Sequence, residues 1–232
     1  MNIKVLTSKI YREKTLNKIQ TKILMLGGKQ KYDAVDFMNV RIFTSLILFI
    51  VIIFTGSLSY IYAPLLVIIY YIIFEYLFLD YKLKQREKKL DYEALHFFEI
   101  LSLTLESGRD LESSIEITCY NTNSELSNEF KRALFEIKFG KSLMEALEDM
   151  KKRIPSETVN NIILNIVQTN IFGNSILDTM YNQIEFLRDK QILAIKEKIN
   201  KIPNKVSIVS VLFIVPLILL LLLGPFLVEF LN

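Results

Sequence analysis

The chain has 232 residues, a hydrophobic content of 51% and a formal net charge of +3. Its single cysteine, Cys119, excludes an intramolecular disulfide and a cysteine cluster for zinc. Its single histidine, His96, leaves a histidine-based metal site or catalytic triad very poorly supplied. The apolar residues fall into two blocks with a charged stretch between them, and this distribution indicates a membrane protein with a central polar domain.

Residues 1–41 predict a cytoplasmic, amphipathic N-terminal region of one or two helices. Apolar positions recur among its lysines, at Ile10, Leu16, Ile19, Ile23 and Leu24. We expect this region either to pack on the central domain or to lie on the anionic inner leaflet of the membrane. The regular apolar face argues against a nucleic-acid-binding arm, so no nucleic-acid partner is expected.

Residues 42–79 predict a transmembrane helical hairpin. Residues 42–74 carry no charge, a length that exceeds the roughly 20 residues of one span and suffices for two short spans. The stretch 56–64, which contains glycine, serine and proline, predicts the turn. A single long, tilted helix is the alternative, and Pro64 disfavours it because proline lacks a backbone N–H.

Glu75 lies near the inner end of the second predicted span. An ionisable residue at that depth is a candidate functional residue. We favour a structural interpretation, in which Glu75 reaches the inner interface or pairs with a lysine of residues 82–89.

Residues 206–232 predict a C-terminal transmembrane helix with expected kinks at Pro216, Gly224 and Pro225. Lysine and arginine cluster before the first span, after the second and before the third, and they are missing from the hairpin tip and the last residues. This pattern predicts a multi-pass protein of the cytoplasmic (inner) membrane. The N-terminus and central domain would be cytoplasmic and the C-terminus outside.

Residues 80–205 predict a cytoplasmic helical domain, because apolar residues recur at helical spacing and no alternating strand pattern occurs. The predicted fold class is therefore an all-α membrane protein with three transmembrane helices and a cytoplasmic six-helix bundle of three helical hairpins. The six helices are expected at about 91–106, 110–120, 124–139, 142–153, 156–172 and 175–200. Their predicted core faces carry Leu95, Phe98, Leu101 and Leu105; Phe130, Leu134, Ile137 and Phe139; Ile162, Ile163, Ile166 and Val167; and Ile176, Met180, Ile184 and Leu187.

Three similar turns divide these helices. In each, a glycine that can adopt the left-handed position after a helix is followed two residues later by an Asp or Ser that can cap the next helix. The pairs are Gly108 with Asp110, Gly140 with Ser142, and Gly173 with Ser175. Ser142 also precedes Glu145 by three residues, which is the spacing of a capping box.

The sequence contains no convincing catalytic, cofactor-binding or metal-binding motif. The stretch Gly140-Lys141-Ser142 resembles the end of a phosphate-binding loop, but Phe135 occupies the position of the required earlier glycine. We expect His96 to be a partly buried structural histidine and Cys119 a small packing residue. We therefore expect no enzyme activity, and no catalytic, cofactor-binding or metal-binding residue.

Residues 91–231 resemble the type II secretion F domain, which pilus and secretion platform proteins share. The matching segments are residues 94–101 with 105–108, 139–142 with 146–147, 168 with 172–175, and 201–203 with Pro216 and 223–225. Residues 23–28 and 32–37, followed by the two-span block, are similar to the tight-adherence (Tad) branch and its TadC-like member.

The resemblance implies an inner-membrane platform for a type IV-like (Tad) pilus or a type II secretion pseudopilus. It implies a hexameric secretion ATPase, pilins and a second, TadB-like platform protein as partners, in a homo- or hetero-oligomer within the lipid bilayer. The platform would couple the ATPase to extraction of pilins from the membrane through joints at residues 82–89 and 200–206. Arg109 and Lys141 are candidate ATPase contacts, with ordinary solvent-exposed charges as the alternative.

Other functions remain open at this point. A membrane-anchored helical adaptor or signalling protein would have the same architecture and would need no ATPase. A membrane-embedded enzyme lacks a recognisable nucleophile, metal set or phosphate loop. A transporter would need intramembrane polar residues, which three almost wholly apolar spans supply poorly.

Overall fold

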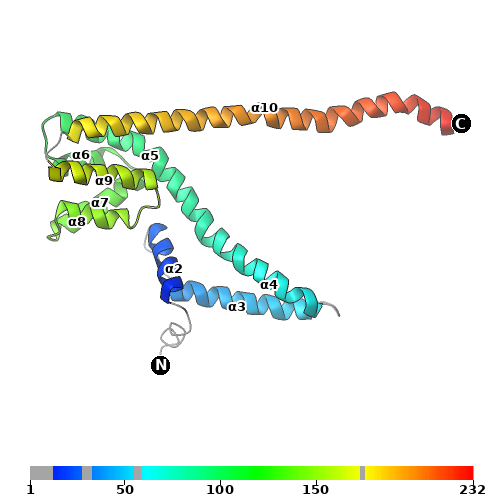
Figure 1. Cartoon of the computed structure of the whole chain (residues 1–232), viewed down its shortest axis with the longest axis horizontal. Helices are drawn as coiled ribbons and strands as arrows, with labels where there is room; N and C mark the ends of the chain where they lie inside the picture. Colours follow the sequence, from blue (N-terminus) through cyan, green and yellow to red (C-terminus); the bar gives the residue numbers. More distant parts are fainter. Residues whose placement is uncertain (1–12, 28–32, 55–58, 173–175, 232) are drawn as a thin grey trace. The chain divides into compact units, whose positions relative to one another are not determined.

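The computed structural model describes residues 13–27, 33–54, 59–172 and 176–231, and every regular element in these ranges is helical (Figure 1). The all-α prediction is therefore confirmed for this part of the chain. Residue contacts divide the chain into two units, Met1–Ile184 and Glu185–Asn232.

The first unit begins with helix α2 (Glu13–Met25) and a pair of apolar helices, α3 (Ala34–Ile53) and α4 (Ser59–Glu75). Helices α3 and α4 pack against each other, which agrees with the predicted hairpin (Figure 1). Within the described residues, two helical runs are long and apolar enough to cross a membrane: Ala34–Ile53, and a stretch within Tyr62–Glu106. Only 17% of each apolar window is buried, so most of these side chains are free to face lipid.

The turn of the hairpin is shorter than the sequence predicts. Helix α3 ends at Ile53 and α4 begins at Ser59, so Pro64 lies inside α4 rather than in the turn. Proline at this place removes one backbone hydrogen bond near the start of the helix. Membrane helices accommodate that loss where neighbouring groups satisfy the freed carbonyl.

The second apolar helix continues into the helical domain without a loop. Helix α4 is followed directly by a π-helical turn, η1 (Tyr76–Asp80), and then by α5 (Tyr81–Glu106). The predicted joint at residues 82–89 is therefore helical. A five-residue π-helical turn between two α-helices is uncommon and often marks a functional place in a protein.

Helices α5 to α9 build a bundle around three phenylalanine rings. Phe130 stacks on Phe97, with ring centroids 4.5 Å apart, and meets Phe98 edge-on at 6.3 Å. The remaining helices are α6 (Leu111–Asn121), α7 (Glu125–Lys138), α8 (Leu143–Lys151) and α9 (Glu157–Phe172). Each packs on its neighbour in the chain, and α5 also contacts α7 and α9.

The predicted core faces are mostly buried, with one clear error. Phe139 is 76% exposed, although it was expected beside Leu134 in the core. Five helical residues correspond to about 500°, so Phe139 points roughly 140° away from Leu134. It lies against Phe135, another exposed ring, with centroids 4.6 Å apart.

The start of α10 (Ile176–Leu231) adjoins this bundle. Met180 and Ile184 are buried, and the Tyr181 hydroxyl donates to the Glu106 carboxylate. Five bundle helices are thus established by their mutual packing, while the complete six-helix, three-hairpin arrangement stays a prediction. Gly173 and Ser175, the third predicted turn, lie outside the described residues.

The second unit, Glu185–Asn232, contains the rest of α10. Its described part includes an apolar stretch, Ser207–Leu223, with Pro216 inside the helix. The backbone is also helical at Gly224, at Pro225 and through the predicted joint at residues 200–206. This apolar stretch is shorter than a full span, so the third transmembrane helix stays a prediction.

Removal of the central ring should destabilise the bundle. We expect Phe130→Ala to lower the free energy of unfolding by about 3–5 kcal/mol, because it leaves a cavity between Phe97 and Phe98. Denaturant unfolding of the full chain in detergent, followed by circular dichroism, measures the loss. The control on the same helix is Phe135→Ala, which removes a 60% exposed ring and should change stability by no more than about 0.5 kcal/mol. Equal effects of the two variants would contradict this core assignment.

Candidate functional site

A buried arginine of α5, Arg86, joins three separate parts of the chain. Its Nε donates to Glu125 Oε1 at 2.5 Å and its Nη2 donates to Glu129 Oε1 at 2.7 Å, both on α7. Its Nη1 donates to the backbone oxygen of Arg153 at 2.8 Å, just after α8. The same Nη1 also donates to the backbone oxygen of Met25, the last residue of α2.

A second arginine completes this cluster. Arg153 donates from Nε to Glu129 Oε2 at 3.2 Å and from Nη1 to Glu136 Oε1 at 3.0 Å. Glu129 is 7% exposed and lies between two guanidinium groups, so both of its oxygens are paired. Removing one partner of such a buried pair typically costs about 3–5 kcal/mol, because the other charge is left without compensation. We call Arg86, Glu125, Glu129, Glu136 and Arg153 the junction cluster.

Gly27 shapes the contact between α2 and the junction cluster. Its φ of +67° is in the left-handed region that favours glycine. A Cβ atom on Gly27 would lie 2.5 Å from the guanidinium carbon of Arg86. Only glycine therefore lets the end of α2 approach Arg86 closely enough for the bond to the Met25 carbonyl.

A second cluster of charged side chains lies at the base of the apolar helices α3 and α4. Lys22 of α2 pairs with Glu75 at 2.9 Å and with Asp80 at 2.6 Å. Arg41 of α3 pairs with Glu75 at 3.0 Å, and its guanidinium sits 3.5 Å above the ring of Tyr71. We call Lys22, Arg41, Glu75 and Asp80 the membrane-edge cluster.

The membrane-edge cluster corrects the expected partner of Glu75. Its carboxylate pairs with Lys22 and Arg41 and not with a lysine of residues 82–89. Sequence reasoning looked for the nearest basic run, whereas packing of α2 and α3 brings cations from 34 and 53 residues away. Burial alone would lower the pKa of Lys22, but the carboxylates of Asp80 and Glu75 outweigh it and raise that pKa.

Helix α2 therefore holds the long α4–η1–α5 helix on both sides of the π-helical turn. Lys22 reaches Glu75 immediately before the turn and Asp80 at its end, and the carbonyl of Met25 reaches Arg86 beyond it. Its apolar face, with Ile19 and Ile23 each 1% exposed, packs against residues of α3 and η1. The apolar face of α2 was expected on the central domain or on the inner leaflet, but it packs on the apolar helices instead, and α2 reaches the bundle only through the bond from Arg86 to the Met25 carbonyl.

Two of the three predicted helix turns lie within the described residues. Gly108 and Gly140 have φ values of +80° and +97°. Asp110 accepts from the backbone N–H of Ser113 at 2.9 Å. Ser142 accepts from the backbone N–H of Glu145 at 3.2 Å, and Glu145 accepts from that of Ser142 at 3.0 Å, which is the predicted capping box.

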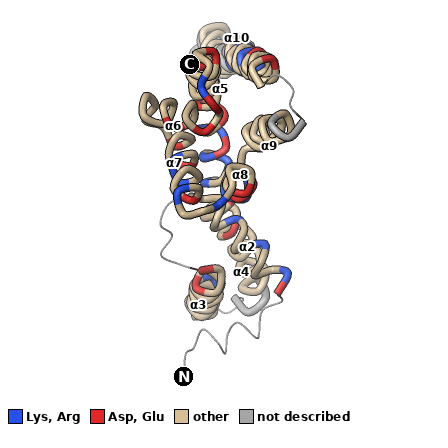
Figure 2. The backbone as a smooth tube through the Cα atoms, turned by 90° about the vertical axis from the view of Figure 1, so that its left-hand side faces the viewer, with Lys and Arg blue, Asp and Glu red and all other residues tan. Residues whose placement is uncertain are grey.

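The two candidate ATPase contacts differ in their surroundings. Arg109 is exposed in the turn before α6. Lys141 is also exposed, but it pairs with Asp149 at 2.8 Å and with Glu136 at 2.7 Å. Together with Lys152, Lys141 lowers the pKa of Asp149 to about 2. Figure 2 shows acidic and basic residues side by side on α7 and α8.

The remaining candidates are Cys119 and His96. Cys119 is buried, donates to the carbonyl of Ser127 at 3.6 Å, and has a pKa raised to about 12 by burial, which agrees with a packing role. His96 is exposed, so the expectation of a partly buried histidine is wrong. It lies beside Phe97 in sequence but one helical step of about 100° away from the buried face. Among the described residues, no group of three or more His, Cys, Asp or Glu could hold a metal ion.

Sequence reasoning missed the junction cluster. Arg86 lies four residues before Leu90 and eight before Ala94, both fully buried, so it occupies the apolar face of α5. An arginine in the core stripe of an amphipathic helix is the signal that could have found it. Its partners on α7 and after α8 could not be identified from the sequence.

These features define a helical protein in which the apolar helix α4 continues into a bundle, with buried ion pairs inside the bundle and further ion pairs at the base of the apolar helices. A comparison with protein-family models matches residues 97–224 to "Type II secretion system (T2SS), protein F". The match covers more than half of the chain, and the chain belongs to this family. The family comprises inner-membrane proteins of secretion and pilus platforms. Neither curated proteins nor solved structures gave a match.

A side chain at position 27 should release α2. We expect Gly27→Ala to displace Arg86, because the new Cβ would occupy the place of its guanidinium. Backbone amide exchange of residues 13–25 in the full chain should then accelerate at least tenfold, which hydrogen–deuterium exchange measures. The control is Gly108→Ala, which also has a positive φ but open space around its Cβ, and which should leave exchange in α2 unchanged. Unchanged exchange in Gly27→Ala would contradict the role of this contact.

The junction cluster should also make stability depend on pH. Burial raises the pKa of Glu125, but hydrogen bonds and charges of Arg86 and Lys89 outweigh burial and lower it. A carboxyl with a lowered pKa in the folded state contributes stability above its unfolded pKa, about 4.3, and loses it as pH falls through the folded value. We expect the denaturant midpoint to fall as the pH drops below about 4.3. Glu125→Gln should flatten that dependence and Glu112→Gln, on the exposed side of α6, should not.

Proposed function

We propose that this chain is an inner-membrane platform of a type IV-like (Tad) pilus or type II secretion pseudopilus, of the TadC-like kind. In this function it couples a hexameric cytoplasmic secretion ATPase to extraction of pilins from the bilayer. It hydrolyses nothing itself, and a second, TadB-like platform protein accompanies it. The N-terminus and the helical domain are cytoplasmic in this proposal, and the C-terminus is outside.

The observation that carries the proposal is the loop-free helix α4–η1–α5. A force applied to the bundle would reach the apolar α4 through a continuous helix, whereas a flexible loop would absorb it. The junction cluster supports this role, because it holds α5, α7 and the end of α8 together through buried charges. The family assignment supports the setting, a secretion or pilus machine.

Helix α2 would set the stiffness of this connection. It braces the long helix before and after the π-helical turn, through Lys22 and the Met25 carbonyl. A π-helical turn contains hydrogen bonds that can rearrange to ordinary helical ones, which makes it a suitable hinge. In this proposal the brace keeps the hinge closed until the ATPase acts on the bundle.

The ATPase contact is the part of the proposal that mutagenesis tests most directly. We expect the double variant Arg109→Glu, Lys141→Glu to reduce co-purification of a co-expressed hexameric secretion ATPase by at least fivefold. The two charges lie in turns at exposed positions, and charge reversal would repel an acidic surface. Co-purification of the full chain from membranes with the tagged ATPase provides the measurement.

The control for this experiment is Lys138→Glu. Lys138 is another exposed lysine of the α7–α8 region with a carboxylate partner, Glu116, at 3.1 Å. It should retain the ATPase, which separates a specific contact from a general effect of charge. If the double variant binds the ATPase as well as the parent, Arg109 and Lys141 are not contacts. If the parent itself binds no ATPase, the adaptor function is favoured instead.

A further inference from the structure

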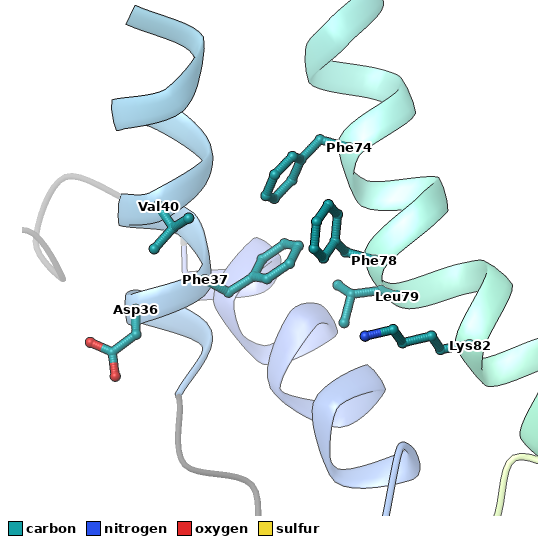
Figure 3. A pocket seen from close by; sticks show the side chains of 7 residues that line it. All are labelled: Asp36, Phe37, Val40, Phe74, Phe78, Leu79 and Lys82. Carbon is teal, nitrogen blue, oxygen red and sulfur yellow. The ribbon is translucent and has the colours of Figure 1, made fainter. Parts of the chain in front are cut away.

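A pocket of about 270 Å³ lies between α3 and the π-helical end of the second apolar helix (Figure 3). Its walls are apolar: Phe37 and Val40 from α3, and Phe74, Phe78 and Leu79 from α4 and η1. The rings of Phe74 and Phe78 stack at 4.5 Å, and Phe37 lies 5.5 Å from Phe74, so aromatic packing holds the walls in place.

One basic side chain crosses the mouth of the pocket. Figure 3 shows the ammonium group of Lys82 directed toward Leu79 and Phe37, whereas the carboxylate of Asp36 points away from the pocket. The Lys82 Nζ lies 5.8 Å from the centre of the Phe78 ring. The pocket therefore has an apolar interior and two charged residues at its edge: Lys82, which is directed across the mouth, and Asp36, whose carboxylate points away.

In the proposed membrane setting, the pocket lies at the level of the membrane surface. Val40 and Phe74 belong to the helices that are apolar enough to span, and Lys82 is the first basic residue after the second of them. Val40 and Phe78 are 53% and 49% exposed, so the pocket opens sideways, toward the place where lipids would lie. A ligand there would meet hydrocarbon depth and headgroup depth at once.

We propose that this pocket binds one anionic phospholipid, with an acyl chain between Phe37, Phe74 and Phe78 and its phosphate on Lys82. This rests on the membrane embedding contained in the proposed function. Acyl chains gain little by moving from lipid to an apolar pocket, so selectivity must come from the headgroup. One basic residue at an anionic surface contributes about 1 kcal/mol, which corresponds to about a fivefold preference over a zwitterionic lipid.

The chain contains no tryptophan, so a single introduced one reports on its own surroundings. We would place Phe78→Trp in the full protein in phosphatidylcholine vesicles and add brominated phosphatidylglycerol or brominated phosphatidylcholine, whose bromines quench tryptophan on contact. The expected result is half-maximal quenching by the phosphatidylglycerol at about one fifth of the mole fraction needed for the phosphatidylcholine. Val40→Trp, on the opposite wall, is a second reporter should Phe78→Trp fold poorly.

Substitutions at the mouth of the pocket test whether Lys82 causes a preference for phosphatidylglycerol over phosphatidylcholine. In the Phe78→Trp background, Lys82→Gln should abolish the preference and Lys82→Arg should keep it. Lys84→Gln, which removes an exposed lysine outside the pocket, should also keep it. Equal quenching of Phe78→Trp by the two lipids, or a preference that survives the added Lys82→Gln, overturns the lipid site.

A mid-span reporter distinguishes failure of this proposal from failure of the proposed function. Ile47→Trp lies in the middle of α3 and is expected to be quenched by both lipids alike. If Ile47→Trp is quenched and Phe78→Trp shows no preference, the lipid site alone is wrong. If neither lipid quenches Ile47→Trp, the helices are not embedded, and both proposals fail.

Discussion

The buried carboxylate of Glu129 between Arg86 and Arg153 is the interaction on which the arrangement of the first unit depends. Taking three charges out of water is costly, and the cost is offset only when each charge is paired and hydrogen-bonded. Here both oxygens of Glu129 are used, and Arg86 finds two further acceptors in backbone carbonyls. Because those carbonyls belong to α2 and to the segment after α8, satisfying Arg86 fixes the positions of both. A hydrophobic residue at position 86 could fill the space but could not specify these partners.

The pairing of Arg86 also explains how the single helix α4–η1–α5 is held against the bundle without a loop. Helix α5 supplies Leu90, Ala94, Phe97 and Leu101 to the core, so its C-terminal part is held by burial. Its N-terminal part carries few core residues and is held by Arg86 and by α2. The two kinds of support meet within α5, between Arg86 and Leu90. The π-helical turn lies before α5, and Glu75 and Arg86 on its two sides are eleven residues, or about 16 Å, apart along the helix. Core packing therefore holds the C-terminal part of this continuous helix, and hydrogen-bonded ion pairs hold the part before it.

Much of the fold could be predicted from local signals, since helices, caps and turns depend on neighbouring residues. Asp110, Ser142 and Gly140 act as expected because a cap needs only residues within four positions. Long-range pairs behaved differently: the partners of Glu75 and Arg86 come from α2, α3 and α7, and no spacing in the sequence identifies them. Pro64 was misplaced because proline is a strong breaker in water and a weaker one near the start of an apolar helix.

The two polar clusters have different physical characters, and this bears on how the protein could move. The junction cluster is deeply buried, so breaking it would expose charges to a low-dielectric interior and cost several kcal/mol. Within the membrane-edge cluster Arg41 is also buried, but the pairs of Lys22 are more open, with the Asp80 side chain 40% exposed, and they can exchange with water at a smaller cost. A conformational change would therefore begin at Lys22 and the π-helical turn, while Arg86 keeps α2 attached to the bundle. This order makes the membrane end of α2 the movable contact and its bundle end the fixed one.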